Sequence, residues 1–273
     1  MDKEMIMIID CGFSLIKVLV ISDNKVIKSF IADYNEDLLA IYQKCNTTDV
    51  IIFGVNCEKV RNRLKTYVDC VYELSEIDSI GFLSEHYSCN NTLVVSFGSG
   101  ITFVEYNKGE VKFVTGVGYG ACALKELYRI IFPQYSFKEV LGLSSQGIIA
   151  NTNTEVGKRN IIPSDWLFEK TTLIGFSHHS EIPSDIALGI LRMFMDGINS
   201  IVRTALNYKE IDKIILTGTT FVNKKAKEIL DYDFQDADHV ICATPEYGAC
   251  IGAYYVYLRR ILHDNKSELK IRN

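Results

Sequence analysis

Three short glycine-containing turns carry the residue types that best suit phosphate chemistry in this sequence. Asp10–Ser14, Phe97–Gly100 and Thr217–Thr220 each end an apolar run. A glycine leaves the backbone N–H groups of a turn unshielded, and such groups can cradle a phosphate. Taken singly, each turn is explained better as an ordinary connection between strands. Their recurrence at three strand ends predicts a nucleotide clamp.

The side chains in and beside these turns suit different parts of a bound nucleotide. Asp10 can hold a magnesium ion, and Lys17 or backbone donors can neutralise phosphate charge. The third turn precedes a predicted helix and suits an adenosine group. We therefore expect ATP and Mg2+ to bind here, with Asp10 as the metal ligand. The expected nucleotide contacts are Gly12, Ser14, Lys17, Gly98, Ser99, Gly100, Gly218, Thr219 and Thr220.

Strands must position the turns, and the sequence predicts two similar sets of them. Apolar β-forming residues run almost unbroken in each set, and each begins with a meander whose first turn contains glycine. The predicted strands are 5–9, 15–21, 26–32, 49–53 and 68–74 in the first half, and 92–97, 101–106, 111–115, 212–216 and 239–243 in the second. The second half therefore repeats the opening of the first, which indicates a duplicated α/β chain.

Helical spacing of apolar residues predicts the remaining elements. The predicted helices are 36–44, 57–67, 79–86, 121–131, 137–150, 184–207, 223–230 and 250–262. The tail after His263 is charged, so we expect it to be frayed. The helix 184–207 is apolar on more than one stripe, which suits a core helix covered on both sides and an interface about equally.

Composition excludes several classes of function. The chain has 273 residues, enough for two modest domains or one large one, and a formal net charge of -5. Its pI of about 5.6 gives no basic surface for nucleic acid. No apolar run approaches the roughly 20 residues of a membrane span, and the opening residues do not resemble a signal peptide. We expect a cytoplasmic protein without nucleic-acid or membrane partners.

The eight cysteines favour buried thiols over metal binding. No two form a CxxC pair, and most have apolar neighbours. Reduced side chains are therefore expected rather than disulfides or zinc ligands. His178 and His179 are adjacent but lack a cysteine or acidic partner at ligand spacing, so we predict no metal cluster there.

Longer motifs follow one another along nearly the whole chain. They are Asp10-Cys-Gly-Phe-Ser-Leu-Ile-Lys17, Ser96-Phe-Gly-Ser-Gly-Ile-Thr102, Val114-Thr-Gly-Val-Gly-Tyr-Gly120, Gly197-Ile-Asn-Ser200, Ile211-Asp-Lys-Ile-Ile-Leu-Thr-Gly218 and Glu246-Tyr-Gly-Ala-Cys-Ile-Gly-Ala253. In this order they resemble the type II pantothenate kinase family, of the acetate and sugar kinase/Hsp70/actin superfold. The first segment, for example, is similar to the family's D-x-G-G-T-L-x-K loop.

This resemblance implies a fold, a reaction and an assembly. The fold is α/β, with two duplicated ribonuclease H-like (actin-like ATPase) domains at 1–88 and 89–273 and a nucleotide cleft between them. The second domain carries the dimer helix of an expected homodimer, and the last helix is expected to pack back on the first domain. The implied reaction is ATP-dependent phosphorylation of pantothenate, the first step of coenzyme A biosynthesis. The resemblance adds Gly118, Gly120 and Gly248 to the nucleotide contacts.

The resemblance also implies a catalytic base and an acceptor site. The base is a glutamate in an E-[LF]-D-type segment, which Glu76-Ile-Asp78 fits in residue type and position. Glu73 is an alternative if the register differs, and Glu76 has a structural explanation as an acid at a helix N-terminus behind Ser75. The expected acceptor residues are Lys112, Thr115, Gly116 and Tyr119.

Four departures from the family pattern fall at the site. Phe13 and Val55 stand where the family has glycine, and Phe113 replaces an arginine that would contact the substrate and the transition state. A triple glycine is interrupted at Gly118-Tyr-Gly120. Loss of an active-site cation costs roughly 10²–10³ in rate, unless Lys112 or Arg129 replaces it.

The departures leave three functions open. The chain is a pantothenate kinase, a relative with little or no catalysis that binds nucleotide or a coenzyme A-like ligand in a regulatory role, or a kinase for another small hydroxylated substrate. Fold similarity does not choose among them. Asp165, His178 and His179 fall in a region that lines the substrate side in the family, and the sequence assigns them no role.

Overall fold

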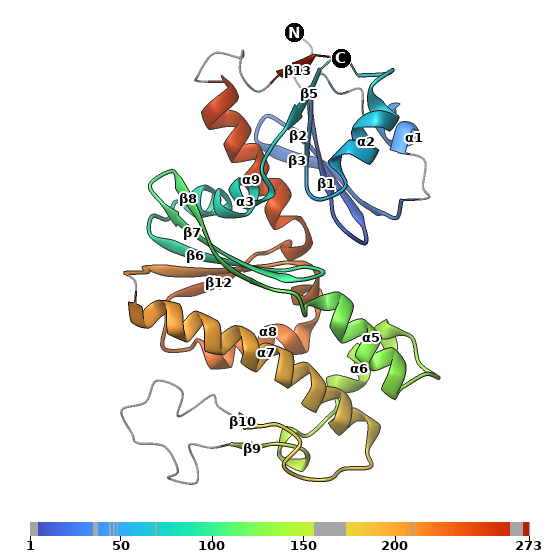
Figure 1. Cartoon of the computed structure of the whole chain (residues 1–273), viewed down its shortest axis with the longest axis vertical. Coiled ribbons are helices and arrows are strands. Elements are labelled where there is room, and N and C mark those ends of the chain that lie inside the picture. The colour runs from blue at the N-terminus through green and yellow to red at the C-terminus, as the bar shows by residue number, and fades with distance from the viewer. Residues whose placement is uncertain are drawn as a thin grey trace.

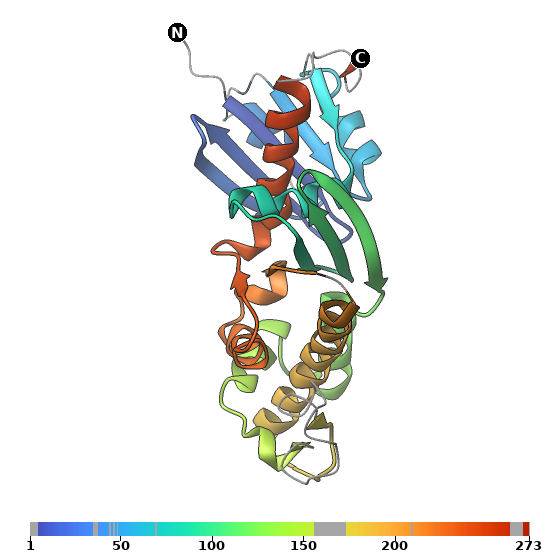
Figure 2. The ribbon, with the colours of Figure 1, turned by 90° about the vertical axis from the view of Figure 1, so that its left-hand side faces the viewer.

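A computed structural model describes residues 5–34, 38–43, 45, 47, 49–68, 70–155, 173–208, 210–262 and 270–272. Asp165 lies outside these ranges. The described chain forms two mixed sheets that lie one above the other, with helices between and outside them (Figure 1). The view turned by 90° shows the long axis running from the first sheet to the helices below the second (Figure 2).

The first sheet has the strand order β13-β5-β4-β1-β2-β3. Strands β1 (Met5–Cys11), β2 (Ile16–Ser22) and β3 (Lys25–Ala32) form the predicted antiparallel meander. Strands β4 (Asp49–Phe53) and β5 (Cys70–Glu73) then add in parallel on the other side of β1. The β-branched residues of β1 and β4 are buried on both faces, as expected for central strands.

The second sheet repeats this topology. Its order is β12-β11-β6-β7-β8, in which β6 (Thr92–Phe97), β7 (Ile101–Asn107) and β8 (Glu110–Val117) form the meander. Strands β11 (Lys213–Thr217) and β12 (His239–Ile241) pair in parallel beyond β6. The duplication predicted from the two meanders is thus confirmed over five strands of each sheet.

Nine α-helices surround the sheets in the described part of the chain. They are α1 (Leu38–Gln43), α2 (Cys57–Leu64), α3 (Glu76–Gly81), α4 (Leu83–His86), α5 (Ala121–Ile131), α6 (Phe137–Ser144), α7 (Pro183–Tyr208), α8 (Lys224–Asp233) and α9 (Gly248–Val256). Short 3-10 turns occur at Ile149–Asn151, Thr219–Val222 and Pro245–Tyr247, and a small two-stranded sheet joins β9 (Thr154–Glu155) to β10 (Leu173–Ile174). Helices α5 to α8 cover the outer face of the second sheet, and α2 covers the outer face of the first.

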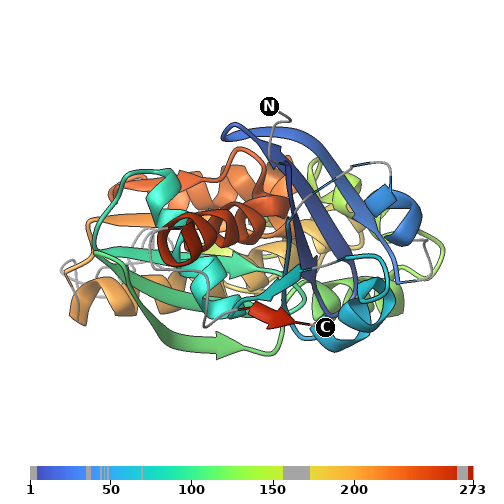
Figure 3. The same cartoon turned by 90° about the horizontal axis from the view of Figure 1, so that it is seen from above.

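Helix α9 lies between the two sheets and packs directly on the first. Its side chains join a cluster with Phe53 and Tyr72 of the first sheet, while α3 and α4 separate it from the second. The view from the end where both termini lie shows α9 beside the first sheet (Figure 3). Gly252 lets α9 approach α3 closely, because a Cβ there would lie 1.9 Å from the carbonyl oxygen of Ser79.

Several predicted elements differ from the observed ones. The predicted helix 79–86 is two short helices that meet at Phe82. The predicted helix 137–150 ends at Ser144, because the chain must then bring Gly147 against α7, where a Cβ would lie 2.3 Å from the Ser184 carbonyl oxygen. The last helix begins at Gly248 and continues as a π-helical turn over Tyr257–Leu262.

The charged tail was predicted to be frayed, and this is wrong for residues 270–272. Strand β13 (Lys270–Arg272) pairs antiparallel with β5 and forms one edge of the first sheet. The backbone of β5 supplies the unpaired edge that the tail joins, which no side-chain pattern reveals.

Two further observations concern cysteines and membranes. The cysteines described at 11, 45, 57, 89, 122, 242 and 250 are free thiols, and five of them are buried, as predicted. None of the helices in the described ranges combines the length and the apolar character that a bilayer span needs.

We expect Gly252→Ala to lower the free energy of unfolding by about 1–3 kcal/mol, because the added methyl group must push α9 away from α3. Thermal and urea unfolding would measure this. Gly142→Ala is the matched control, since a Cβ at Gly142 on α6 meets nothing within 4 Å. The control should be neutral or stabilising by about 0.5–1 kcal/mol. Equal effects of both changes would contradict close packing of α9 on α3.

Candidate functional site

A cavity of about 920 Å³ opens where the loops of the two sheets face each other. Chain reversals after β1, β6 and β11 reach it, together with the first residues of α3, because central strands of both sheets end at this level. The structure thus brings together most of the predicted nucleotide contacts and the predicted base. The predicted residues that line the cavity are Asp10, Gly12, Ser14, Lys17, Glu76, Gly98, Ser99, Gly100, Gly218 and Thr219.

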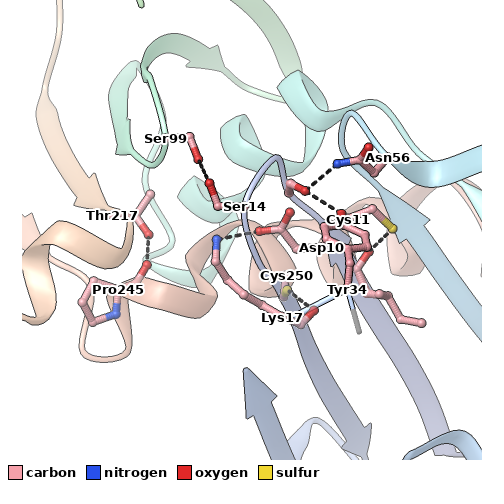
Figure 4. A network of polar contacts seen from close by, with 12 residues as sticks. Asp10, Cys11, Ser14, Lys17, Tyr34, Asn56, Ser99, Thr217, Pro245 and Cys250 are labelled. Carbon is pink, nitrogen blue, oxygen red and sulfur yellow. Dashed lines mark hydrogen bonds and ion pairs between the residues drawn. The ribbon is translucent and has the colours of Figure 1, made fainter. Parts of the chain in front are cut away.

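A buried ion pair forms the floor of this cavity. Asp10 and Lys17 are direct partners across β1 and β2, and Lys17 Nζ donates to Asp10 Oδ2 at 2.8 Å (Figure 4). Their side chains are only 9% and 14% exposed. Burial alone would lower the pKa of Lys17, but the attraction of Asp10 outweighs it, so the pKa lies above its ordinary value. The lysine therefore stays charged.

The first two glycine turns touch across the cavity. The Oγ atoms of Ser14 and Ser99 lie 3.3 Å apart, and Ser14 Oγ is also 3.3 Å from Cys122 Sγ at the start of α5 (Figure 4). Gly120 lets the start of α5 approach the second turn closely, since a Cβ there would lie 2.6 Å from the Gly100 backbone. Gly120 was predicted as a nucleotide contact, but the structure gives it a packing role beside the second turn.

The first turn is held in place from its outer side. Asn56 Nδ2 donates to the Gly12 carbonyl oxygen at 2.9 Å, and the hydroxyl of Tyr34 donates to the same oxygen at 2.5 Å. Gly54 has a φ of 101°, and a Cβ on it would lie 2.8 Å from the Cys11 carbonyl oxygen. The turn that carries Val55 is therefore fixed against the turn that carries Phe13.

Phe13 and Val55 add apolar surface to the cavity rim. Both line the cavity, with 73% and 68% of their side chains exposed. At these two positions the family pattern has glycine, so both departures add side-chain atoms to the cavity lining. The structure shows that both departures line the same cavity, which the sequence could not.

The third glycine turn, Thr217–Thr220, is closely packed against neighbouring backbone. Gly218 has a φ of 114° and approaches the Phe97 backbone so closely that a Cβ would lie 2.3 Å from its carbonyl oxygen. Thr217 Oγ1 donates to the Pro245 carbonyl oxygen at 2.8 Å, and a Cβ on Gly248 would lie 1.9 Å from Thr217 Oγ1. Gly248 is thus a packing glycine. Thr220 is buried and does not line the cavity.

Glu76 lies in the cavity at the first position of α3. Ser75 caps this helix by accepting from the backbone N–H of Asp78 at 3.3 Å. Burial raises the pKa of Glu76, repulsion from Asp10 raises it further, and Lys17 partly opposes both. Glu73 instead accepts from Arg61 at 2.8 Å and does not line the cavity. Of the two predicted glutamates, the structure places Glu76 at the site.

The predicted acceptor residues on and after β8 do not line the cavity. Strand β8 is the far edge of its sheet, and Lys112, Thr115 and Gly116 remain there. The ring of Tyr119 packs edge-on against Phe194 of α7 at 5.9 Å. Two other predicted or altered positions, Gly118 and Phe113, also lie outside the cavity lining.

Helices α5 and α6 supply a wall that the sequence analysis missed. Lys125, Glu126, Ser136, Phe137 and Lys138 line this side of the cavity. Cys122 and Lys125 are three residues apart on a predicted helix, so they share a face. A shared helix face does not by itself indicate a ligand, so the sequence held no signal for this wall.

Asp10 fits a magnesium ion that is held largely by phosphates. Mg2+ commonly takes one or two carboxylates together with substrate phosphates and waters. Across the described ranges, no group of three or more His, Cys, Asp or Glu side chains is arranged to hold a metal by itself. Asp10, a buried carboxylate beside two glycine turns, suits the shared arrangement.

Solved structures with the same architecture cover nearly the whole chain. (R)-2-Hydroxyglutaryl-CoA dehydratase component A of Acidaminococcus fermentans superposes with a TM-score of 0.62 at 12% identity, over 92% of this chain and 96% of that one. The activator of 2-hydroxyisocaproyl-CoA dehydratase from Clostridium difficile, with bound ADPNP, gives 0.61 at 13% identity, over 93% of each chain. The fold is that of the actin-like ATPases.

A third comparison adds a sugar-bound relative of the same fold. A ROK family protein of Streptococcus pneumoniae in complex with sucrose superposes with a TM-score of 0.55 at 12% identity, over 94% of this chain and 98% of that one. No family model and no curated protein sequence matches the chain. The similarities therefore confirm the predicted superfold and do not single out pantothenate kinases.

We expect Glu76→Gln to stabilise the fold at neutral pH. The pKa of Glu76 is higher in the folded state than in the unfolded chain. Ionisation of Glu76 therefore lowers the free energy of unfolding as the pH rises from the unfolded pKa to the folded pKa. Glutamine carries no charge and avoids this cost. Urea unfolding at pH 7 and pH 4 would show a gain at pH 7 that shrinks at pH 4. A gain of equal size at both pH values would contradict the charge argument.

Proposed function

We propose that this protein is an ATP-dependent kinase that phosphorylates a hydroxyl group of a small molecule, with pantothenate as the first acceptor to test. One observation carries the proposal: a carboxylate with a raised pKa, Glu76, shares a cavity with three glycine turns and a buried Asp10–Lys17 pair. A protein that only binds nucleotide needs no proton acceptor in this place. The choice of pantothenate rests on the family resemblance of the motifs.

The residues divide the reaction between them. Glu76 orients the acceptor hydroxyl and takes its proton while the hydroxyl oxygen forms a bond to the γ-phosphorus. The bond from that phosphorus to the bridging oxygen breaks, and ADP leaves. Backbone N–H groups of the turns at Gly12 and Gly98–Gly100 hold the phosphates, and Gly218 and Thr219 face the adenosine end. Mg2+ bound through Asp10 would neutralise phosphate charge.

A raised pKa suits Glu76 for this task. A general base works best when its pKa approaches the working pH, since it must be ionised and still attract a proton. Burial and the charge of Asp10 move Glu76 in that direction. A magnesium ion at Asp10 would weaken the repulsion from Asp10 and favour the ionised form of Glu76, which is the form that accepts a proton.

Phe13 and Phe113 favour a second candidate, a nucleotide-binding relative that transfers no phosphate. Phe13 adds an aromatic side chain to the cavity lining where the family has glycine. Phe113 stands at the position on β8 where the family resemblance places a positively charged arginine. The same fold occurs in an activator with bound ADPNP, whose name describes no transfer to a small hydroxylated molecule. In this second candidate, the protein would bind nucleotide between its two sheets and would transfer no phosphate to an acceptor molecule.

The decisive measurement is ADP release with magnesium and ATP, with and without pantothenate. We expect release that depends on pantothenate and falls by roughly 10²–10⁴-fold in Glu76→Gln. Calorimetry should show that this variant still binds ATP, because Glu76 acts on the acceptor rather than the nucleotide.

Glu73→Gln is the matched control. It makes the same chemical change three residues away, at a side chain that pairs with Arg61 outside the cavity, so turnover should be unchanged. A panel of other small hydroxylated acceptors would separate a different kinase from the pantothenate assignment. ATP binding without transfer to any acceptor would favour the second candidate and refute the kinase.

A further inference from the structure

Phosphoryl transfer needs positive charge around the moving phosphate, and this cavity has few cations to offer. Lys17 is already bonded to Asp10. The two replacements that the sequence suggested for the missing arginine both fail. Lys112 does not line the cavity, and Arg129 donates from Nε to Glu126 at 2.7 Å and lies outside the lining as well.

Lys125 remains as a cation with access to the cavity. It lines the cavity from the second turn of α5, is exposed, and makes no ion pair or hydrogen bond with the residues that the structure describes. Cys122 lies three residues earlier on the same face of α5, and its Sγ is 3.3 Å from Ser14 Oγ. The face of α5 that carries Lys125 therefore starts beside Ser14, whose hydroxyl group also approaches Ser99 of the second glycine turn.

Helix α5 is tied directly to the second glycine turn. The backbone N–H of Ala121 donates to the Gly98 carbonyl oxygen at 2.9 Å, and that of Cys122 donates to Ser99 at 3.4 Å. These bonds fix the helix against the turn, so the base of the Lys125 side chain has a defined position relative to that turn. A lysine places a compact charge with three donors at the end of a flexible stem.

We propose that Lys125 binds the terminal phosphate of ATP and stabilises its charge during transfer. The proposal rests on the kinase function above and names the cation of the same site. The proton of the acceptor goes to Glu76, the new bond joins the acceptor oxygen to phosphorus, and the bond to ADP breaks.

Lys138 also lines the cavity, from α6, and is the natural competitor. The first turn of α6 is closed by its own capping box, in which Ser136 and Glu139 bond to each other's backbone. The capping bonds of α6 lie within its own first turn, whereas the first two N–H groups of α5 donate to the second glycine turn, so Lys125 stands on the helix that is fixed to that turn. We therefore assign the terminal phosphate to Lys125.

The kinetic test compares Lys125→Met with two other changes. We expect kcat to fall roughly 10²–10³-fold in Lys125→Met with little change in KM for the acceptor, and Lys125→Arg to recover part of the loss. Arg129→Met removes the same charge one turn further along α5, at a side chain outside the cavity, and should leave turnover unchanged. A larger loss in Lys138→Met than in Lys125→Met would overturn the assignment.

A binding test keeps the proposal separate from the kinase function. Calorimetry would compare ADP with ADPNP, a non-hydrolysable analogue that carries the third phosphate. Lys125→Met should weaken ADPNP binding by about tenfold or more and leave ADP binding unchanged. This arm stands even if the wild type phosphorylates no acceptor, which would refute the kinase alone. Equal affinities of the variant and the wild type for ADPNP, or equal losses for both nucleotides, would refute the role of Lys125.

Discussion

The placement of α9 between the two sheets sets the geometry of the whole molecule. Gly252 brings this helix against the Ser79 carbonyl oxygen of α3, and Phe53 and Tyr72 close on its other side. Helix α9, together with α3 and α4, thus sets the distance between the sheets. The site depends on that distance, since the Ser14 and Ser99 hydroxyl groups approach each other from opposite sheets. The packing of α9 on α3 therefore helps to decide whether the first two glycine turns face each other across one cavity.

Sequence patterns predicted the duplicated fold well because each meander buries regular apolar strands and turns on glycine. They failed where tertiary contacts decide the local outcome. Strand β13 forms because β5 has a free edge, and α6 ends early because Gly147 must lie against α7. Neither constraint appears in the periodicity of the residues concerned.

The site was predicted in part, for a comparable reason. Asp10 and Lys17 were both recognised, yet only the register of β1 and β2 makes them direct neighbours. Glycine motifs do not distinguish ligand contact from close packing, and Gly120 and Gly248, which were predicted as nucleotide contacts, lie where a side chain would meet protein atoms. Lys125 was missed because a single lysine on a predicted helix does not indicate a site. Only the position of α5 against the second glycine turn places it at the cavity.

The inner face of the first sheet gains its cover late in synthesis. Its strands β1 to β5 are complete at Glu73, whereas α9 begins at Gly248. A ribosome needs on the order of ten seconds to cross that interval, and until then Phe53 and Tyr72 lack their helical partner. The nascent first half is thus an apolar sheet without its cover, and it requires either rapid collapse or protection by a chaperone during that period.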